Sequence, residues 1–203
     1  VYTVVNGEVL PMCPRDLVLT PAWTWHDHHN EGKSRAVWLD VLDVPLVIRL
    51  GQTVYETYGN STQPIRSQRS DYISDRVLPV RPGWAQRPRD NYPLRYAWQD
   101  VSTILDRFAE SEGSPYHGVL LEYVNPATGG PTLPTMSCWL QMLRPGFATK
   151  EHRQTPSSVF HVVEGSGVTI VGDQEIHWSQ NDVFVVPNWT WHGHVNRSKS
   201  DRP

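Results

Sequence analysis

Residues 21–30 read PAWTWHDHHN, and residues 187–196 read PNWTWHGHVN. The same offset of 166 residues, applied without a gap, also aligns Thr3 with Thr169 and Asp16 with Asp182. Short apolar runs separated by turn residues lie before each motif, a pattern typical of short strands in an antiparallel sheet. The sequence therefore contains two copies of one β unit, and we expect an antiparallel sandwich or small barrel from each.

The overall composition excludes several classes of function. The chain has 203 residues, a formal net charge of -3 and no cluster of basic residues, so nothing favours a nucleic-acid partner. No apolar run approaches the roughly 20 residues of a membrane span, and residues 1–10 lack the layout of a signal peptide. Cys13 and Cys138 lie far apart and outside any CxxC motif, which fits a reducing compartment. We expect a soluble, cytoplasmic protein.

We expect three segments along the chain. Residues 1–58 form the C-terminal part of the first β unit, residues 59–116 an arm and linker, and residues 117–203 the second β unit. Helical spacing predicts one helix near 97–111, with a packing face made by Trp98, Val101, Leu105 and Phe108.

Residues 35–48, which read RAVWLDVLDVPLVI, are predicted to continue the first unit as strand. Residues 59–95 are rich in Arg, Ser, Pro and Asn, so we interpret them as an irregular arm. Four arginines of this arm are considered: Arg66, Arg69, Arg76 and Arg81. We expect them in solvent or at a subunit interface, and contact with a substrate carboxylate is the alternative.

The repeat also predicts that the sequence is an internal piece of a longer protein. About thirty residues of strand-rich sequence precede Val168 in the second copy, and the first copy has no counterpart to them. The second copy stops at the point where the first continues into residues 35–48. We therefore expect both copies to be truncated.

The histidines of the motif indicate a metal site. In an extended strand, side chains two residues apart share a face, so His26 and His28 point the same way. His192 and His194 repeat this arrangement in the second copy. A single strand histidine is most often a packed or surface residue, but a paired HxH in the same frame of a duplicated unit favours a metal ligand.

The second copy offers a weaker candidate site. His152 and Gln154 lie at i and i+2 in KEHRQT, and a barrel would bring them opposite His192. A neutral amide is a poorer ligand than imidazole, so metal binding by His152, Gln154 and His192 is doubtful. The alternative is a second unit without metal.

These residues resemble the two signature motifs of the cupin superfamily, G-x5-H-x-H then E-x6-G, and P-x-G-x2-H-x3-N. Three positions depart from the pattern: Gln154 replaces a His, Ser158 stands where the Glu belongs, and a Trp replaces the Gly in both copies, at Trp23 and Trp189. Within cupins, LTPAWTWHDHHNEG followed by WLDVLDVPLV resembles the gentisate 1,2-dioxygenase group, which includes salicylate and 1-hydroxy-2-naphthoate dioxygenases.

The resemblance implies an all-β bicupin with one helix in its linker, usually a homotetramer, with non-haem Fe(II) in the first cupin. It assigns the metal to His26 and to two further histidines, which the repeat offset places 40 and 38 residues before His26. It also implies that His28 lies near substrate and oxygen and that Asp40 is an acid beside the active site. The alternation around Asp40 would bury its carboxylate among apolar residues, where it would need a partner. A strand-end aspartate bonded to a backbone turn is the alternative.

The implied reaction is oxidative ring cleavage. Three neutral imidazoles leave the double charge of Fe(II) uncompensated, so an aromatic acid with a carboxylate and an ortho oxygen can chelate it. The substrates would be a small aromatic acid and O2, with gentisate giving maleylpyruvate. A binding or storage bicupin and a metal-dependent isomerase are the alternatives, and neither should consume oxygen. We expect residues 1–203 alone to bind Fe(II) poorly and to show negligible activity.

Overall fold

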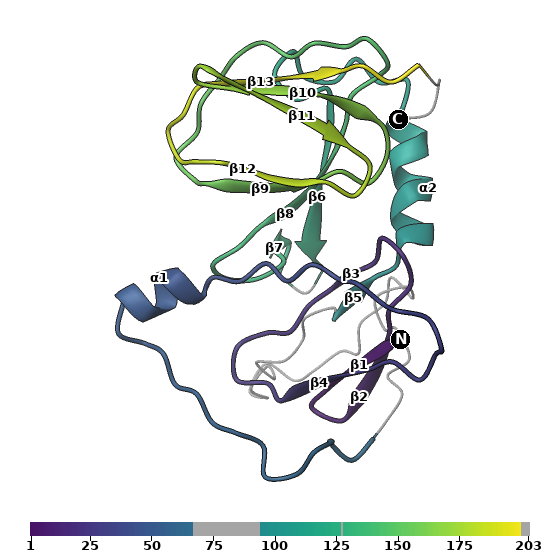
Figure 1. Cartoon of the computed structure of the whole chain (residues 1–203), viewed down its shortest axis with the longest axis vertical. Coiled ribbons are helices and arrows are strands. Elements are labelled where there is room, and N and C mark those ends of the chain that lie inside the picture. The colour runs from purple at the N-terminus through teal and green to yellow at the C-terminus, as the bar shows by residue number, and fades with distance from the viewer. Residues whose placement is uncertain (67–93, 127, 200–203) are drawn as a thin grey trace. The chain divides into compact units, whose positions relative to one another are not determined.

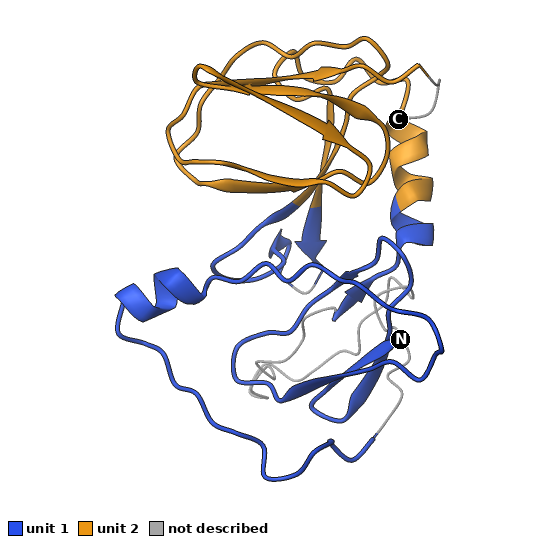
Figure 2. Cartoon of the chain, viewed as in Figure 1, with its two compact units in different colours: residues 1–101, 123–138 blue, residues 102–122, 139–203 orange. Residues whose placement is uncertain are grey.

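The computed structural model describes residues 1–66, 94–126 and 128–199 and is mostly β, with two helices among these residues (Figure 1). The chain divides into two compact units (Figure 2). Unit 1 comprises Val1–Val101 and Tyr123–Cys138, and unit 2 comprises Ser102–Glu122 and Trp139–Pro203. The all-β class predicted from the sequence is confirmed, whereas the segment limits at residues 58 and 116 remain a prediction.

The elements of the first half of the chain are β1 (Tyr2–Val5), β2 (Glu8–Pro11), β3 (Leu17–Val18), β4 (His26–His29) and α1 (Val44–Arg49). They are followed by β5 (Arg95–Tyr96), α2 (Trp98–Phe108), β6 (Val119–Asn125), β7 (Gly130–Pro131) and β8 (Cys138–Met142). The chain ends with β9 (Ser158–His161), β10 (Ser166–Val171), β11 (Gln174–Ser179), β12 (Val183–Val186) and β13 (His192–Asn196).

The repeated motif forms the same strand pair in both units. In unit 1 the sheet order is β2-β1-β4, and the antiparallel register pairs Thr3 with His28. In unit 2 the order is β11-β10-β13, and the register pairs Thr169 with His194. The two pairs are related by the sequence offset of 166, so the duplication predicted from the sequence extends to the strand register.

The central strand of the motif sheet carries buried core residues in both units. Val4 and Val5 on β1 are buried, as is Val168 on β10. The hairpin between β1 and β2 turns at Asn6 and Gly7, both with positive φ, as expected of an Asn-Gly turn that matches the strand twist. Because successive strand residues point to opposite faces, the burial of both Val4 and Val5 shows that both faces of β1 are covered.

The position at which both motifs replace glycine is strained. Trp23 has φ of 63° and Trp189 has φ of 57°, in the left-handed region that disfavours residues with a Cβ. Both side chains are exposed. In unit 2 the Arg153 guanidinium contacts the Trp189 ring, with its Cζ atom 4.3 Å from the ring centroid, and the Trp191 ring at 4.8 Å. These cation–π contacts hold the Trp189 indole in place.

The prediction for residues 35–48 is wrong, whereas the predicted helix near 97–111 is confirmed as α2. Residues 32–43 are irregular, and α1 then begins after Asp43 with proline in its first turn. No residue of α1 is buried. Apolar alternation produces a strand only where another strand pairs with its edge and a packed layer covers its apolar face, and here Val37, Leu39 and Leu42 are exposed.

Of the predicted arm, residues 59–66 and 94–95 lie in the described part of the chain, and Arg95 belongs to β5 rather than to an irregular segment. Residues 59–66 are irregular, as predicted, and Arg66 is exposed with its backbone N–H bonded to the carbonyl of Gly7. Arg69, Arg76 and Arg81 lie outside the described residues. Neither α1 nor α2, the helices of the described residues, is long and apolar enough to cross a membrane.

Substitution of Gly167 by alanine is expected to destabilise unit 2. The new Cβ would overlap the carbonyl oxygen of Val195 and the indole of Trp178, so β10 and β13 would have to separate. We predict a loss of about 2 kcal/mol or more in the free energy of unfolding, measured by urea denaturation. The control is Gly59→Ala, where a Cβ meets nothing within 4 Å. Equal stability of the two variants would contradict the packing described.

Candidate functional site

Strand β4 of unit 1 presents His26 and His28 on one exposed face. Their ring centroids lie 5.6 Å apart, as the strand period predicts. Within the described sheet β4 is an edge strand, since only β1 pairs with it. The candidate ligand therefore lies at an edge that further backbone can join.

His28 contacts the side chains of Thr3 and Trp38. The hydroxyl of Thr3, which is fully buried, lies 2.8 Å from its Nδ1 atom, and the Trp38 ring lies 5.0 Å away between centroids. Partial burial lowers the pKa of His28, and the nearby His26 lowers it further, while the charge of Asp40 acts in the opposite direction. His28 is therefore neutral near pH 7, and its Nε2 atom remains available.

Asp40 does not lie in the setting that the sequence predicted. It is exposed in an irregular segment rather than buried among apolar strand residues. The structure nonetheless brings Asp40 within electrostatic range of His28. His29, which is out of phase with His26, bonds instead to Asp27, with Nε2 to Oδ2 at 2.8 Å.

A cavity of about 160 Å3 borders His26. Its walls come from residues at and just before β4 and from residues at the start of the predicted arm and just before it: Trp25, His26, Asp27, Tyr58, Asn60, Ser61, Thr62 and Gln63. Sequence reasoning missed residues 58–63 as part of this region. They have no periodic pattern or motif, so the sequence offered no signal for them.

Unit 2 brings His152 opposite His192, as predicted. The two residues form an isolated antiparallel bridge through reciprocal backbone hydrogen bonds, and their ring centroids are 4.2 Å apart. His117, which sequence reasoning also missed, packs edge-on against His152 at 4.4 Å. The Nε2 atom of His152 is buried without a hydrogen-bond partner among the described residues. His192 itself is only 2% exposed.

Gln154 does not join these imidazoles. Its Nε2 atom donates to the Ser158 hydroxyl at 2.8 Å. Gln154 and Ser158 stand where the cupin pattern has its second His and its Glu. The two neutral replacements therefore satisfy each other, and only His152 and His192 remain of the four expected donors.

A threonine–histidine hydrogen bond is duplicated, but its third partner differs between the copies. Thr169 lies 2.8 Å from Nδ1 of His194, the same distance as in the unit 1 pair. In unit 2 the Trp178 indole N–H donates to the Thr169 hydroxyl at 2.9 Å, so the Thr169 O–H is directed to His194. In unit 1 the equivalent residue is Met12, a weak acceptor 2.9 Å from the Thr3 hydroxyl.

The test for a metal centre gives different results in the two units. No group of three or more His, Cys, Asp or Glu residues in the described ranges is arranged to hold a metal ion. In unit 1, His26 is an exposed imidazole of the kind that suits Fe(II), and the two further donors expected from the repeat are not among the described residues. Unit 2 fits poorly, because Gln154 and Ser158 are paired with each other.

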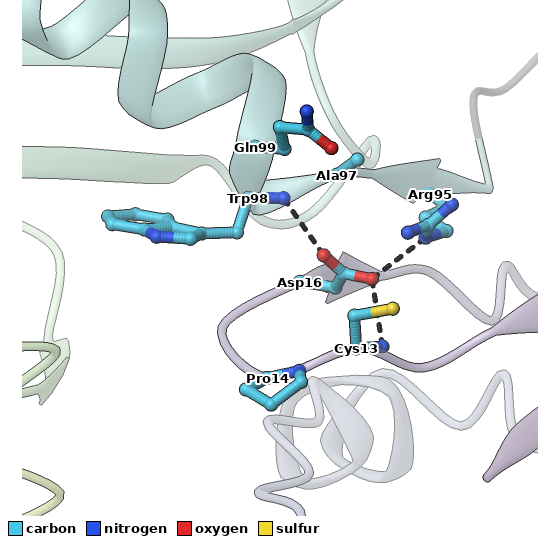
Figure 3. Close-up of a pocket in the computed structure, with 7 residues that line it drawn as sticks. All are labelled: Cys13, Pro14, Asp16, Arg95, Ala97, Trp98 and Gln99. Atoms are coloured by element: carbon cyan, nitrogen blue, oxygen red, sulfur yellow. Dashed lines mark hydrogen bonds and ion pairs between the residues drawn. The ribbon is translucent and has the colours of Figure 1, made fainter.

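A larger cavity of about 380 Å3 lies elsewhere in unit 1, beside Asp16 (Figure 3). The Asp16 carboxylate accepts hydrogen bonds from the backbone N–H groups of Cys13 and Trp98 and pairs with Arg95 at 2.8 Å. It closes a turn and binds the first turn of α2, so its contacts are structural. Asp182 closes the corresponding turn in unit 2.

The duplicated strand pair and its histidines match a known family. A family model described as a cupin domain matches residues 1–42 and 139–201. The chain belongs to the cupin family. Both matched segments contain the repeated histidine motif, and the residues between them lie outside the match.

Curated relatives of this cupin are aromatic-acid dioxygenases by name. It is 44% identical to 1-hydroxy-2-naphthoate 1,2-dioxygenase of Nocardioides sp. (strain KP7), over 93% of this chain and 49% of that protein. It is 45% identical to 5-aminosalicylate 1,2-dioxygenase of Comamonas sp., over 97% of this chain and 53% of that protein. The chain thus spans about half the length of these relatives.

A solved structure shows the same relationship. A point mutant of salicylate 1,2-dioxygenase from Pseudoaminobacter salicylatoxidans superposes with a TM-score of 0.80 at 29% identity, covering 97% of this cupin and 58% of that chain. Another mutant of that enzyme has been solved in complex with gentisate. The resemblance to the gentisate 1,2-dioxygenase group, predicted from the motif and the WLDVLD stretch, is confirmed.

The stability of unit 2 is expected to fall on acidification because of His194. Burial is the main cause that lowers its pKa to about 3, with nearby His192 adding to the effect. Because the unfolded chain takes up a proton near the ordinary histidine pKa and the folded chain does not, stability falls as the pH drops below that value. The slope is about 1.4 kcal/mol per pH unit for one proton.

Urea denaturation between about pH 7 and pH 5 measures this slope. We predict a shallower dependence for His194→Leu than for the wild type. The control is His177→Leu, which changes a histidine that is two-thirds exposed. The assignment is wrong if His194→Leu and the wild type lose stability at the same rate on acidification.

Proposed function

We propose that this cupin is part of a ring-cleaving dioxygenase that uses one Fe(II) to open gentisate or a related ortho-hydroxy aromatic acid with O2. The observation that carries the proposal is the exposed edge of β4 with His26 and His28 on it. The dioxygenase names of the relatives, and the gentisate complex of the structural neighbour, support the choice of reaction.

The second copy supports a specific location for the missing ligands. There the backbone around His152 joins the edge of β13, through the bridges His152 to His192 and Ala148 to Val195. Applied to the first copy, the same register places a strand against β4 with its ligands 40 and 38 residues before His26. We propose that these two residues are histidines and complete the site in a longer protein.

The residues of this chain would then have distinct roles. His26 would hold the metal, and bound Fe(II) would supply a doubly charged centre that binds the carboxylate and ortho oxygen of the substrate and reacts with O2. His28, neutral and held at Nδ1 by Thr3, would meet the substrate through Nε2 and accept or return a hydroxyl proton there. Trp38 packs against His28 and would limit water beside it.

Asp40 would act through charge. It lies within electrostatic range of His28 and opposes the lowering of the His28 pKa by burial, so it would favour proton uptake at Nε2. We further propose, from the family resemblance, a homotetramer in the cytoplasm.

A binding or storage bicupin is the second candidate function. It is supported by the pairing of Gln154 with Ser158, because these two neutral residues stand where the cupin pattern has two metal donors. The same loss in the first copy would leave a protein that binds an aromatic acid without turnover. Identification of the residues 40 and 38 positions before His26 separates the two candidates, because only the enzyme needs histidines there.

Oxygen uptake by the full-length protein loaded with Fe(II) tests the proposal directly. We predict uptake that depends on gentisate, salicylate or 1-hydroxy-2-naphthoate, and a loss of at least about 100-fold in His26→Ala, because each ligand is needed to hold the metal. The exposed His177→Ala variant should keep full activity. Residues 1–203 alone should show negligible uptake.

Binding of an aromatic acid without oxygen consumption by the wild type would contradict the dioxygenase proposal and favour the binding protein. Full turnover by residues 1–203 alone would contradict the assignment of the missing ligands.

A further inference from the structure

The carboxamide of Gln63 joins three separate parts of unit 1. Its Oε1 atom accepts a hydrogen bond from the backbone N–H of Gly7 at 3.1 Å. Its Nε2 atom donates to the carbonyl of Val4 on β1 at 3.2 Å and to Oδ1 of Asp27 on β4 at 2.6 Å. A single side chain outside the sheet thus ties the central strand, the first hairpin turn and the histidine strand together.

Asp27 accepts the third of these bonds and lies on the face of β4 opposite His26 and His28. Its Oδ2 atom also bonds to His29, and the His29 ring stacks on Tyr2 with centroids 4.7 Å apart. The Asp27 carboxylate therefore holds β4 on one face, while His26 and His28 lie on the other. Gln63 is half-buried, so these bonds are partly shielded from water.

The second copy holds its histidine strand in another way. The residue equivalent to Asp27 is Gly193, which has no side chain that could accept such a hydrogen bond. There the N–H of His194 donates to the Thr149 hydroxyl at 2.8 Å, and the Thr149 N–H donates to the His194 carbonyl. The Gln63–Asp27 pair is thus particular to the copy that keeps its histidines exposed.

Glutamine suits this position because it combines an acceptor and two donors in one planar group. A glutamate side chain here would place a carboxylate oxygen against both the Val4 carbonyl and Asp27. Methionine would keep the length of the side chain and remove all of these bonds.

We propose that Gln63 is a positioning residue of the first-cupin metal site, which fixes β4 and thereby the direction of His26 and His28. The inference rests on the proposed function for the identity of the site. It assigns a role to the first residues of the arm, which no motif contains.

The test compares Gln63→Glu and Gln63→Met in the full-length protein. We expect the rate of amide hydrogen exchange at residues 26–29 to rise at least about 10-fold in Gln63→Glu, because β4 loses the hydrogen bond from Gln63 and gains repulsion between carboxylates. The rise should be smaller in Gln63→Met, which loses the bonds without the repulsion. Co(II) titration, followed by its visible absorption, should show affinity reduced at least about 10-fold in Gln63→Glu. The matched control is Gln52→Glu, an exposed glutamine whose bond to the Leu50 carbonyl is 3.5 Å long.

A second variant separates positioning from loss of folding. Asp27→Asn in the Gln63→Glu background removes the repulsion between carboxylates and lets the new amide donate to the introduced carboxylate, so it should recover much of the Co(II) affinity. Unchanged exchange and affinity in Gln63→Glu, or a double variant no better than the single one, would overturn the inference. Co(II) binding and oxygen uptake by the wild type test the proposed function, whereas the variants test only the role of Gln63. The two proposals can therefore fail separately.

Discussion

In both units the motif histidines depend on one hydrogen bond, made between a buried threonine on the central strand and the second histidine of the neighbouring strand. Thr3 and Thr169 are fully buried, and each lies 2.8 Å from an imidazole Nδ1 atom. This bond requires the antiparallel register that places threonine opposite histidine. A slip of one residue in this register would turn the histidines to the opposite face of the strand. The site therefore requires this register.

The two copies have diverged around this shared frame. In unit 2 both motif histidines are buried, with His192 2% and His194 4% exposed. The Trp178 indole N–H also donates a hydrogen bond to the Thr169 hydroxyl there. In unit 1 His26 and His28 are exposed on an edge strand. We interpret unit 2 as the copy that retains the fold and unit 1 as the copy that retains the chemistry. The pairing of Gln154 with Ser158 agrees with this interpretation.

The sequence predicted what repetition and periodicity encode. The offset of 166 residues gave the duplicated strand pair, and apolar spacing gave α2. The strand prediction for residues 35–48 was wrong because an alternating apolar pattern does not show whether anything covers the apolar face. In the structure α1 has no buried residue. Gln63 and His117 were missed for another reason: each reaches its site through the three-dimensional path of an irregular segment, which leaves no periodic trace. The exposure of Asp40 likewise depends on the path of its segment rather than on its neighbours in sequence.

The metal content of the purified full-length protein tests the central claim, that the first copy alone holds the metal, most directly. The account predicts about one iron per subunit, lost in His26→Ala and retained in His192→Ala, because Gln154 and Ser158 of unit 2 bond to each other at two of the donor positions of the cupin pattern. Two irons per subunit, or iron that survives in His26→Ala and disappears in His192→Ala, would contradict it.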